Sequence, residues 1–126
     1  MDPKDRLYHP DHMWARAEDD GYRIGVTDYA TAQLGEVVYL ELPEVGSRVK
    51  AGKALGSIES VKVTSDLISP LDGIVAELNH PALADPSLVE SSPLEAGWLL
   101  RVREVPEGQV DALLDAAAYA GMTGKG

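Results

Sequence analysis

The first notable absence from this sequence is cysteine: a chain of 126 residues without it has no disulfide framework and no thiol chemistry of its own. Positive charge is also scarce, because 11 Lys and Arg face 21 Asp and Glu and leave a net charge of −10. This balance argues against nucleic acids and anionic membrane surfaces as partners. No apolar run approaches the ~20 residues of a membrane-spanning helix.

The N-terminal segment from Met1 to Arg6 has neither an apolar signal core nor the Arg-rich, acid-poor pattern of a transit peptide. It therefore predicts a cytoplasmic protein of bacterial type. The length predicts one domain over residues 1–126, with a core of about residues 7–120 and a flexible tail at 121–126. We expect this domain to be a monomer.

Patterns typical of catalysis or metal binding are missing as well. The three histidines, His9, His12 and His80, show no spacing typical of a metal site, and Pro10 argues against a helix face shared by the first two. No nucleophile elbow and no phosphate-binding glycine loop is present. The sequence thus predicts a non-catalytic protein on which other enzymes act.

A single lysine, Lys62, lies between Val61 and Val63 where a tight turn joins two predicted strands, in the run ESVKVTSD over residues 59–66. An amine at such a tip is easily reached by another enzyme. It is poorly placed as a buried catalyst, which would need desolvation to lower its pKa. The alternative is that this lysine only solubilises a strand end, since Lys is common at exposed edges.

A short repeat surrounds this turn. The segment LELPEVG (Leu40–Gly46) resembles LISPLDG (Leu67–Gly73), with Leu, Pro and Gly recurring at an offset of 27 residues. A repeated strand–Pro-x-x-Gly–strand unit predicts two similar halves packed face to face, with Lys62 on the connection between them.

Alternating apolar residues and turn residues predict a mainly β chain. The expected strands cover residues 13–17, 22–26, 37–42, 53–60, 63–68, 73–78 and 98–103. We predict a loop over residues 79–92, because Pro81, Pro86 and Pro93 oppose long regular elements.

Two helices are expected beside these strands. A short one follows Thr27 as N-cap, with Asp28 in its first turn and Gly35 as its stop. A C-terminal one is expected from Pro106 through Ala120, ended by Gly121. Its expected inward stripe is Leu113, Leu114 and Ala117.

These motifs together resemble the H-protein of the glycine cleavage system, a lipoyl carrier, from about Leu7 to Tyr119. The matching pieces are His12-Met13-Trp14, Gly25-Val26-Thr27-Asp28-Tyr29-Ala30, Leu34-Gly35-Glu36-Val37-Val38, Glu41-Leu42-Pro43-Glu44-Val45-Gly46, Glu59-Ser60-Val61-Lys62, Ser69-Pro70, Gly73 and Gly97-Trp98. The resemblance implies a barrel-sandwich hybrid of lipoyl type: two similar antiparallel halves, a short helix on the N-terminal side and a C-terminal helix.

In that family the lysine of the tip carries lipoate in amide linkage, which implies lipoylation of Lys62 here and a dithiol supplied by the prosthetic group. The resemblance further implies that the neighbours Glu59, Ser60, Val61 and Val63 support this attachment, together with Gly73, eleven residues after the lysine. Because Glu59 is the acid nearest the lysine on the incoming strand, we expect it to help hold the amine for the attaching enzyme.

The resemblance also implies a function and a set of partners. The carrier would take the aminomethyl group of glycine from a pyridoxal-phosphate glycine decarboxylase to a tetrahydrofolate-dependent aminomethyltransferase. A dihydrolipoamide dehydrogenase would reoxidise the arm, and lipoyl-attaching enzymes would modify the unmodified protein. Tethering the arm would replace bimolecular encounters by motion at high effective concentration.

Two departures from the family pattern stand out. Met13 replaces the glutamate of the usual His-Glu-Trp, and Leu94 replaces an aromatic residue. We expect Asp11 and Asp66 to take over from that glutamate as the acids that shelter the cationic arm.

Two alternatives stay open. One is an H-protein-like lipoyl carrier or lipoyl donor in another pathway, for example in sulfur metabolism, which the departure at Met13 favours. The other is a biotin carrier. The tip Val61-Lys62-Val63 argues against it, because biotin carriers usually show Met-Lys-Met there.

Overall fold

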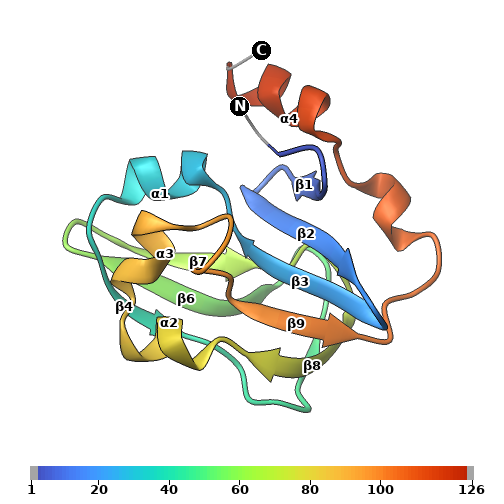
Figure 1. Ribbon diagram of the computed structural model, residues 1–126, viewed down its shortest axis with the longest axis horizontal. Coiled ribbons are helices and arrows are strands. Elements are labelled where there is room, and N and C mark those ends of the chain that lie inside the picture. Colours follow the sequence, from blue (N-terminus) through green and yellow to red (C-terminus); the bar gives the residue numbers. More distant parts are fainter. Residues whose placement is uncertain (1–2, 125–126) are drawn as a thin grey trace.

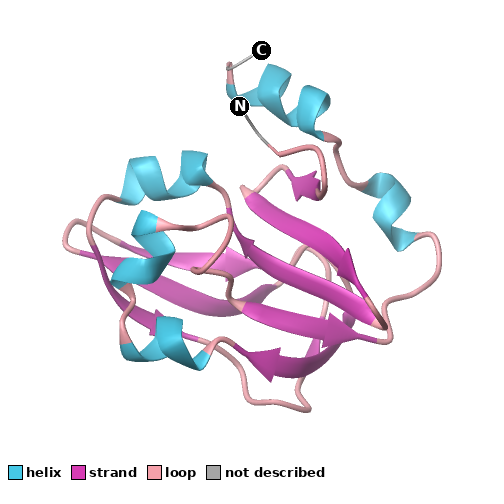
Figure 2. Ribbon diagram, in the orientation of Figure 1, coloured by secondary structure: helices cyan, strands magenta, loops and turns pink. Residues whose placement is uncertain are grey.

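The chain forms two antiparallel sheets that pack face to face, as Figures 1 and 2 show. The computed structural model describes residues 3–124. The strands are β1 (Leu7–His9), β2 (Met13–Glu18), β3 (Gly21–Val26), β4 (Val37–Glu41), β5 (Arg48–Val49), β6 (Ala54–Ser60), β7 (Thr64–Ile68), β8 (Gly73–Leu78) and β9 (Leu100–Arg103). The larger sheet has the order β1-β2-β3-β9-β8-β5, and the smaller one has the order β4-β6-β7.

The helices lie at the margins of this sandwich (Figure 1). They are α1 (Asp28–Leu34), α2 (His80–Ala84), α3 (Ser87–Ser91), the 3₁₀ helix η1 (Gln109–Ala112) and α4 (Ala116–Thr123). Helices α2 and α3 contact β4, α1 contacts α3, and α4 contacts β1. No helix in residues 3–124 is long and apolar enough to cross a membrane.

The predicted mainly β fold of two antiparallel halves is confirmed, and the sequence repeat maps onto it. The first strands of the two repeats, β4 and β7, flank β6 in the small sheet. The second strands, β5 and β8, pair in the large sheet, where Val49 lies opposite Gly73. Each repeat therefore contributes one strand to each sheet, and the β6–β7 hairpin carries Lys62 between them.

The main core fills the space between the sheets. Leu40, Ile58 and Leu67 point into it from the small sheet, and Val75 and Val102 point into it from the large sheet. Burying each such side chain stabilises the fold by about 1.5–3 kcal/mol. This core fixes the inner face of the hairpin that bears the lysine.

Helix α1 begins and ends as the sequence predicts. The Thr27 hydroxyl accepts a hydrogen bond from the Ala30 N–H at 3.3 Å, as an N-cap does. Gly35 is the C-cap, at φ 79°, and its N–H donates to the Thr31 carbonyl at 3.0 Å. The positive φ explains why a glycine ends this helix.

The prediction of a loop over residues 79–92 is wrong, because α2 and α3 occupy this segment. Pro81 lies in the first turn of α2, and Pro86 is the N-cap residue of α3. At these positions a proline removes no intrahelical hydrogen bond. The prolines therefore limit both helices to short pieces without preventing them.

The prediction of one C-terminal helix from Pro106 through Ala120 is also wrong. Gly108 has φ 82°, η1 follows it, and the chain is extended at Leu113. Leu114 then forms a bridge with Tyr8, whose N–H donates to the Leu114 carbonyl at 2.7 Å. The edge of β1 thus pairs with a segment whose apolar residues had indicated a helix.

A new helix, α4, begins after the N-cap Asp115 and ends at the C-cap Gly124, not at Gly121. Its buried residues are Ala116 and Tyr119, whereas Ala117 is exposed. The expected flexible tail is thus helical up to Thr123, and residues 125–126 lie outside the described part of the chain.

A second, smaller core attaches this C-terminal segment to the sheet. Tyr8, Trp14, Ala116 and Tyr119 are buried together, and the rings of Tyr8 and Tyr119 stack at 4.7 Å between centroids. Leu94, one of the two departures from the family pattern, packs against this cluster.

Candidate functional site

The β6–β7 hairpin ends in a turn that a serine holds in shape. The Ser60 N–H donates to the Val63 carbonyl at 2.8 Å. The Ser60 hydroxyl accepts from the N–H groups of Lys62 and Val63, both at 3.1 Å, and lies 3.2 Å from the Val63 carbonyl, to which it can donate. The backbone around the lysine is therefore ordered by one buried side chain.

This turn presents Lys62 outward. Val61 and Val63 on either side are 64% and 49% exposed, and Lys62 itself is exposed. No salt bridge of Lys62 is found among residues 3–124, so in particular none with Glu59. The Lys62 amine is thus held by no carboxylate of the described chain.

A cavity of about 330 Å³ adjoins this hairpin, and we call it the hairpin cavity. Its walls come from the β1–β2 turn, β2, β3, α1, β6 and the β6–β7 hairpin. The lining residues are Asp11, His12, Met13, Val26, Ala30, Gln33, Leu34, Ile58, Val63, Thr64, Ser65, Asp66 and Leu67. Buried aliphatic side chains and Met13 make its floor apolar, and two carboxylates lie among its lining residues.

Asp11 reaches this cavity from a rigid turn between β1 and β2. The His12 N–H donates to the His9 carbonyl at 2.9 Å, which places Pro10 and Asp11 at the two central positions of the turn. His12 follows with φ 67°, the left-handed conformation that often ends three-residue hairpin loops. Pro10 pre-sets the turn and so fixes the position of Asp11.

His12 links the hairpin cavity to the C-terminal helix. Its Nδ1 lies 2.7 Å from the Tyr119 hydroxyl, which in turn lies 2.7 Å from the Thr27 hydroxyl. Burial lowers the pKa of His12, and the nearby Asp11 carboxylate opposes this shift. The imidazole is therefore neutral at neutral pH and adds no positive charge to the cavity.

Asp66 borders the cavity from the edge strand β7. Ser65 lies opposite the buried Ile58 and so shares its inner face, whereas Asp66 lies opposite Ser57 on the outer face. The fold brings Asp11 and Asp66, 55 residues apart in the sequence, to one cavity. The Asp66 side chain belongs to its outer rim.

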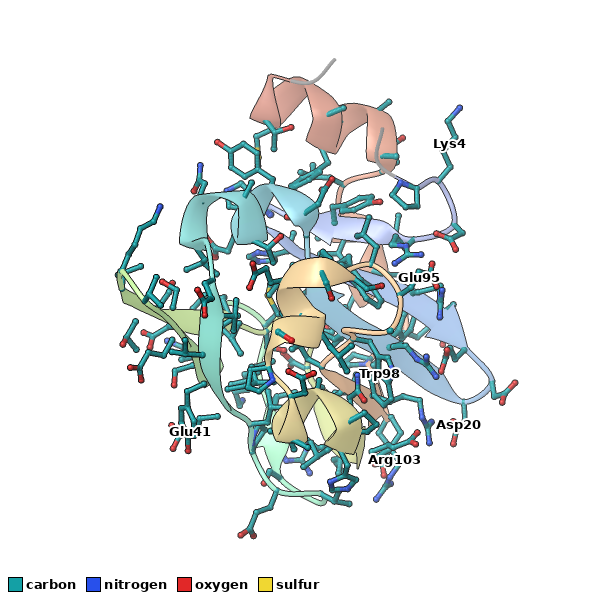
Figure 3. The ribbon with its side chains drawn as sticks, turned by 60° about the vertical axis from the view of Figure 1, so that its left-hand side comes forward. Lys4, Asp20, Glu41, Glu95, Trp98 and Arg103 are labelled. Carbon is teal, nitrogen blue, oxygen red and sulfur yellow. The ribbon has the colours of Figure 1, made fainter. Side chains whose placement is uncertain are left out.

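Glu59 lies on the outer face of the small sheet. It pairs with Thr64 on one side and Tyr39 on the other, and Glu41 extends the same face on β4 (Figure 3). All four side chains are exposed. This face therefore offers carboxylates and a tyrosine to an approaching enzyme, without a contact between Glu59 and the lysine.

Positive charge gathers elsewhere, in the large sheet. Arg16 lies opposite Arg23, which lies opposite Arg101. Acidic neighbours neutralise this row, for example Asp20 at 2.8 Å from Arg101. In Figure 3 the labelled Asp20 and Arg103 lie on the opposite side of the molecule from the green β6–β7 hairpin. The exposed acids Asp11, Glu59 and Asp66 lie beside or on the β6–β7 hairpin, away from this row.

Gly73 is not part of this surface. It begins β8 in the large sheet, and it does not line the hairpin cavity. A Cβ at this position would lie 2.8 Å from the Arg103 carbonyl oxygen and 3.1 Å from the Val102 Cβ. A side chain at residue 73 would therefore clash with the neighbouring strand, which explains why a glycine is found there.

Comparisons of the sequence with a family model and with known proteins all point to one family. A family model described as Glycine cleavage H-protein matches residues 6–125. The glycine cleavage system H protein of Listeria innocua serovar 6a is 48% identical over 117 residues, which cover 93% of this chain and 94% of that protein. The one from Geobacillus thermodenitrificans is 41% identical over 98% of both chains.

A solved structure agrees with these sequences. The crystal structure of a glycine cleavage system H protein from Mycobacterium marinum superposes with a TM-score of 0.87 at 41% identity, covering 97% of this chain and 98% of that one. This chain belongs to the glycine cleavage H-protein family. Membership favours the H-protein interpretation over a biotin carrier.

The H-protein family implies a lipoyl group on a lysine, and the geometry around Lys62 is compatible with one. The amine is exposed for acylation, and the adjoining cavity has an apolar floor suited to a hydrocarbon chain and a dithiolane ring. Met13, 2% exposed, contributes to that floor where the family usually has a glutamate. Sequence reasoning missed the Ser60 hydroxyl contacts, although serine hydroxyls often cap turns.

Proposed function

We propose that this protein is the lipoyl-carrying shuttle of the glycine cleavage system, with lipoate attached to Lys62. The observation that carries the proposal is the exposed amine on an ordered turn beside the hairpin cavity. When attached, lipoate would supply an oxidised dithiolane, whose S–S bond breaks as one sulfur takes up the aminomethyl group of glycine. The group would then pass to the next enzyme and leave a dithiol to be reoxidised. The chain itself supplies presentation and shelter and performs no catalysis.

The proposed partners follow from this role. They are glycine decarboxylase, aminomethyltransferase, dihydrolipoamide dehydrogenase and the enzymes that attach lipoate, all in the cytoplasm. The acidic surface around Lys62 favours partners with basic binding faces. The hairpin would reach each partner as part of a single domain, which we propose spans residues 1–126 and acts as a monomer.

Mass spectrometry tests the attachment site. The full chain, expressed with lipoate and a lipoate–protein ligase, should gain one lipoyl group, and peptide mapping should place it on Lys62. Lys62→Arg keeps the charge and should gain none. Modification of Lys4, Lys50, Lys53 or Lys125 instead, or a biotin increment, would overturn the proposal.

Asp11 and Asp66 have a proposed role toward the cargo. Both border the hairpin cavity, and a cationic amine there would be attracted to their carboxylates. Attraction at about 4 Å is worth about 1 kcal/mol in water and more in a sheltered site. This corresponds to a change in lifetime of several-fold. His12, held neutral by burial, does not oppose this attraction.

The variant Asp11→Asn/Asp66→Asn tests this role. After loading with glycine and the decarboxylase, the isolated carrier should lose formaldehyde and ammonia several-fold faster than the wild type. Lipoylation and reduction of the free arm should stay nearly unchanged. The matched control is Asp19→Asn/Asp111→Asn, which removes the same charge from exposed sites outside the cavity. Equal decay of both variants would contradict the proposed role.

The second candidate function is a lipoyl carrier for another pathway, which the replacement of the family glutamate by Met13 favours. The loading step separates the two functions. A lipoylated wild type that a competent glycine decarboxylase cannot load would favour this second function.

A further inference from the structure

The Lys62 side chain lies against the backbone of Gly35. A Cβ placed on Gly35 would be 3.3 Å from the Lys62 Cε and 3.7 Å from its Nζ. The end of the lysine stem therefore occupies the space beside Gly35 that a side chain would need. Lys62 forms no salt bridge among residues 3–124, so no ion pair holds its side chain in this position.

The backbone at Gly35 independently demands glycine. Its φ of 79° and ψ of −139° lie in a region that other residues adopt only under strain. Gly46 and Gly52 also have positive φ, but a Cβ at either would meet nothing within 4 Å. Among these three glycines, only Gly35 is covered by another side chain.

The turn is fixed relative to this glycine. The Val61 N–H donates to the carbonyl of Glu36, the residue after Gly35, at 3.0 Å. The Ser60 hydroxyl orders the N–H of Lys62 from the other side. The backbone at the start of the lysine side chain is thus held by one bond to the Ser60 hydroxyl and, one residue earlier, by one bond to the segment that carries Gly35.

Gly35 directly follows Gln33 and Leu34, two residues that line the hairpin cavity. The Lys62 amine therefore lies beside the C-terminal end of α1, close to the residues of the cavity wall.

We propose that Gly35 is a positioning residue for the acceptor lysine, an inference that rests on the proposed lipoylation of Lys62. Its bare backbone forms a notch that holds the lysine stem in one direction before the acylating enzyme arrives. A lysine side chain has many rotamers, and restricting them in advance lowers the entropy lost when the amine enters an enzyme's active site. A Cβ at residue 35 would lie 3.3 Å from the Lys62 Cε, so the lysine stem would have to move aside.

The test compares Gly35→Ala with Gly52→Ala in the unmodified full chain. Both variants place a Cβ on a backbone of positive φ, but only the first does so under Lys62. In the wild type, NMR should show a nuclear Overhauser effect between Lys62 Hε and Gly35 Hα. In Gly35→Ala, Lys62 Cε relaxation should show a freer side chain, and kcat/KM for lipoylation by a lipoate–protein ligase should fall about five-fold. Gly52→Ala should match the wild type in both.

Other outcomes would contradict the proposed role of Gly35. An absent Overhauser effect in the wild type would do so even if Gly35→Ala failed to fold. Equal slowing of Gly35→Ala and Gly52→Ala would assign the effect to backbone strain. A wild type that shows the Overhauser effect but accepts no lipoate at Lys62 would refute the proposed function instead, so the two failures are distinguishable.

Discussion

Replacing Ser60 by alanine removes the hydroxyl that orders the turn around Lys62. This hydroxyl accepts two backbone hydrogen bonds at 3.1 Å and lies 3.2 Å from a carbonyl that it can donate to. Each such bond contributes about 0.5–1.5 kcal/mol net. Lys62 and Val63 are exposed, so water can solvate their freed N–H groups and the low end of this range applies.

We therefore expect Ser60→Ala to cost about 1–1.5 kcal/mol in the order of the turn. This is a factor of about five to ten in the population of the ordered tip. If the loss were global, the melting temperature of a domain of this size would fall by about 3–6 °C. Because Ser60 is only 5% exposed and lies at the end of β6, we expect part of the loss to be global.

The assay has two readouts. Hydrogen exchange of the Lys62 and Val63 amides should accelerate about five-fold, and kcat/KM for lipoylation should fall by a similar factor. The matched control is Ser57→Ala, the same chemical change on the same strand, at a half-buried serine whose hydroxyl contacts no turn amide. Ser60→Thr keeps the hydroxyl and should retain most of the ordering. If Ser60→Ala and Ser57→Ala behave alike in both readouts, the reasoning is refuted.

Three further changes have defined outcomes. Glu59→Ala, next to the turn, should slow lipoylation while the free energy of unfolding changes by less than about 0.5 kcal/mol; kinetics equal to those of Glu41→Ala would contradict a role in recognition. Gly73→Val should lower the free energy of unfolding by more than about 1 kcal/mol, because its Cβ would lie 2.8 Å from a backbone oxygen. Gly121→Val, where a Cβ meets open space, is its control in thermal melts. Burial lowers the pKa of His12, so the unfolded chain takes up the proton at a higher pH than the folded chain does. The free energy of unfolding should therefore fall as the pH drops from about 6.5 through the lower folded pKa. Measured by urea unfolding between about pH 7.5 and pH 5.5, this decrease should be smaller in His12→Gln than in the wild type.

Much of the fold follows from residues that act on their near neighbours. Thr27 caps α1 and Gly35 ends it because a hydroxyl and a positive φ act within one turn of helix. The hairpin that carries Lys62 follows from alternating strands and a short turn. The position of Lys62 at the tip of this hairpin could therefore be predicted from the sequence.

The C-terminal segment could not be predicted in this way. Leu113, Leu114 and Ala117 have the spacing of one helix face, yet Leu114 pairs with Tyr8 because the edge of β1 offers unpaired backbone groups. Such pairing depends on an edge more than 100 residues away, which local propensity does not contain. The two helices near Pro81 and Pro86 could not be predicted for a related reason. The effect of a proline depends on where a helix begins, and tertiary packing decides that point.

The tertiary structure decides which residues surround Lys62. The sequence named Asp11 and Asp66, and the packing of the two sheets brings both to one cavity. The family resemblance implies that Gly73 supports the attachment of lipoate, and the structure places this glycine in the large sheet against the Arg103 carbonyl. The contact of Lys62 with Gly35 joins segments that the pairing of β4 with β6 brings together. Local hydrogen bonding and side-chain preferences determined the amine and its turn, while long-range packing decided what surrounds them.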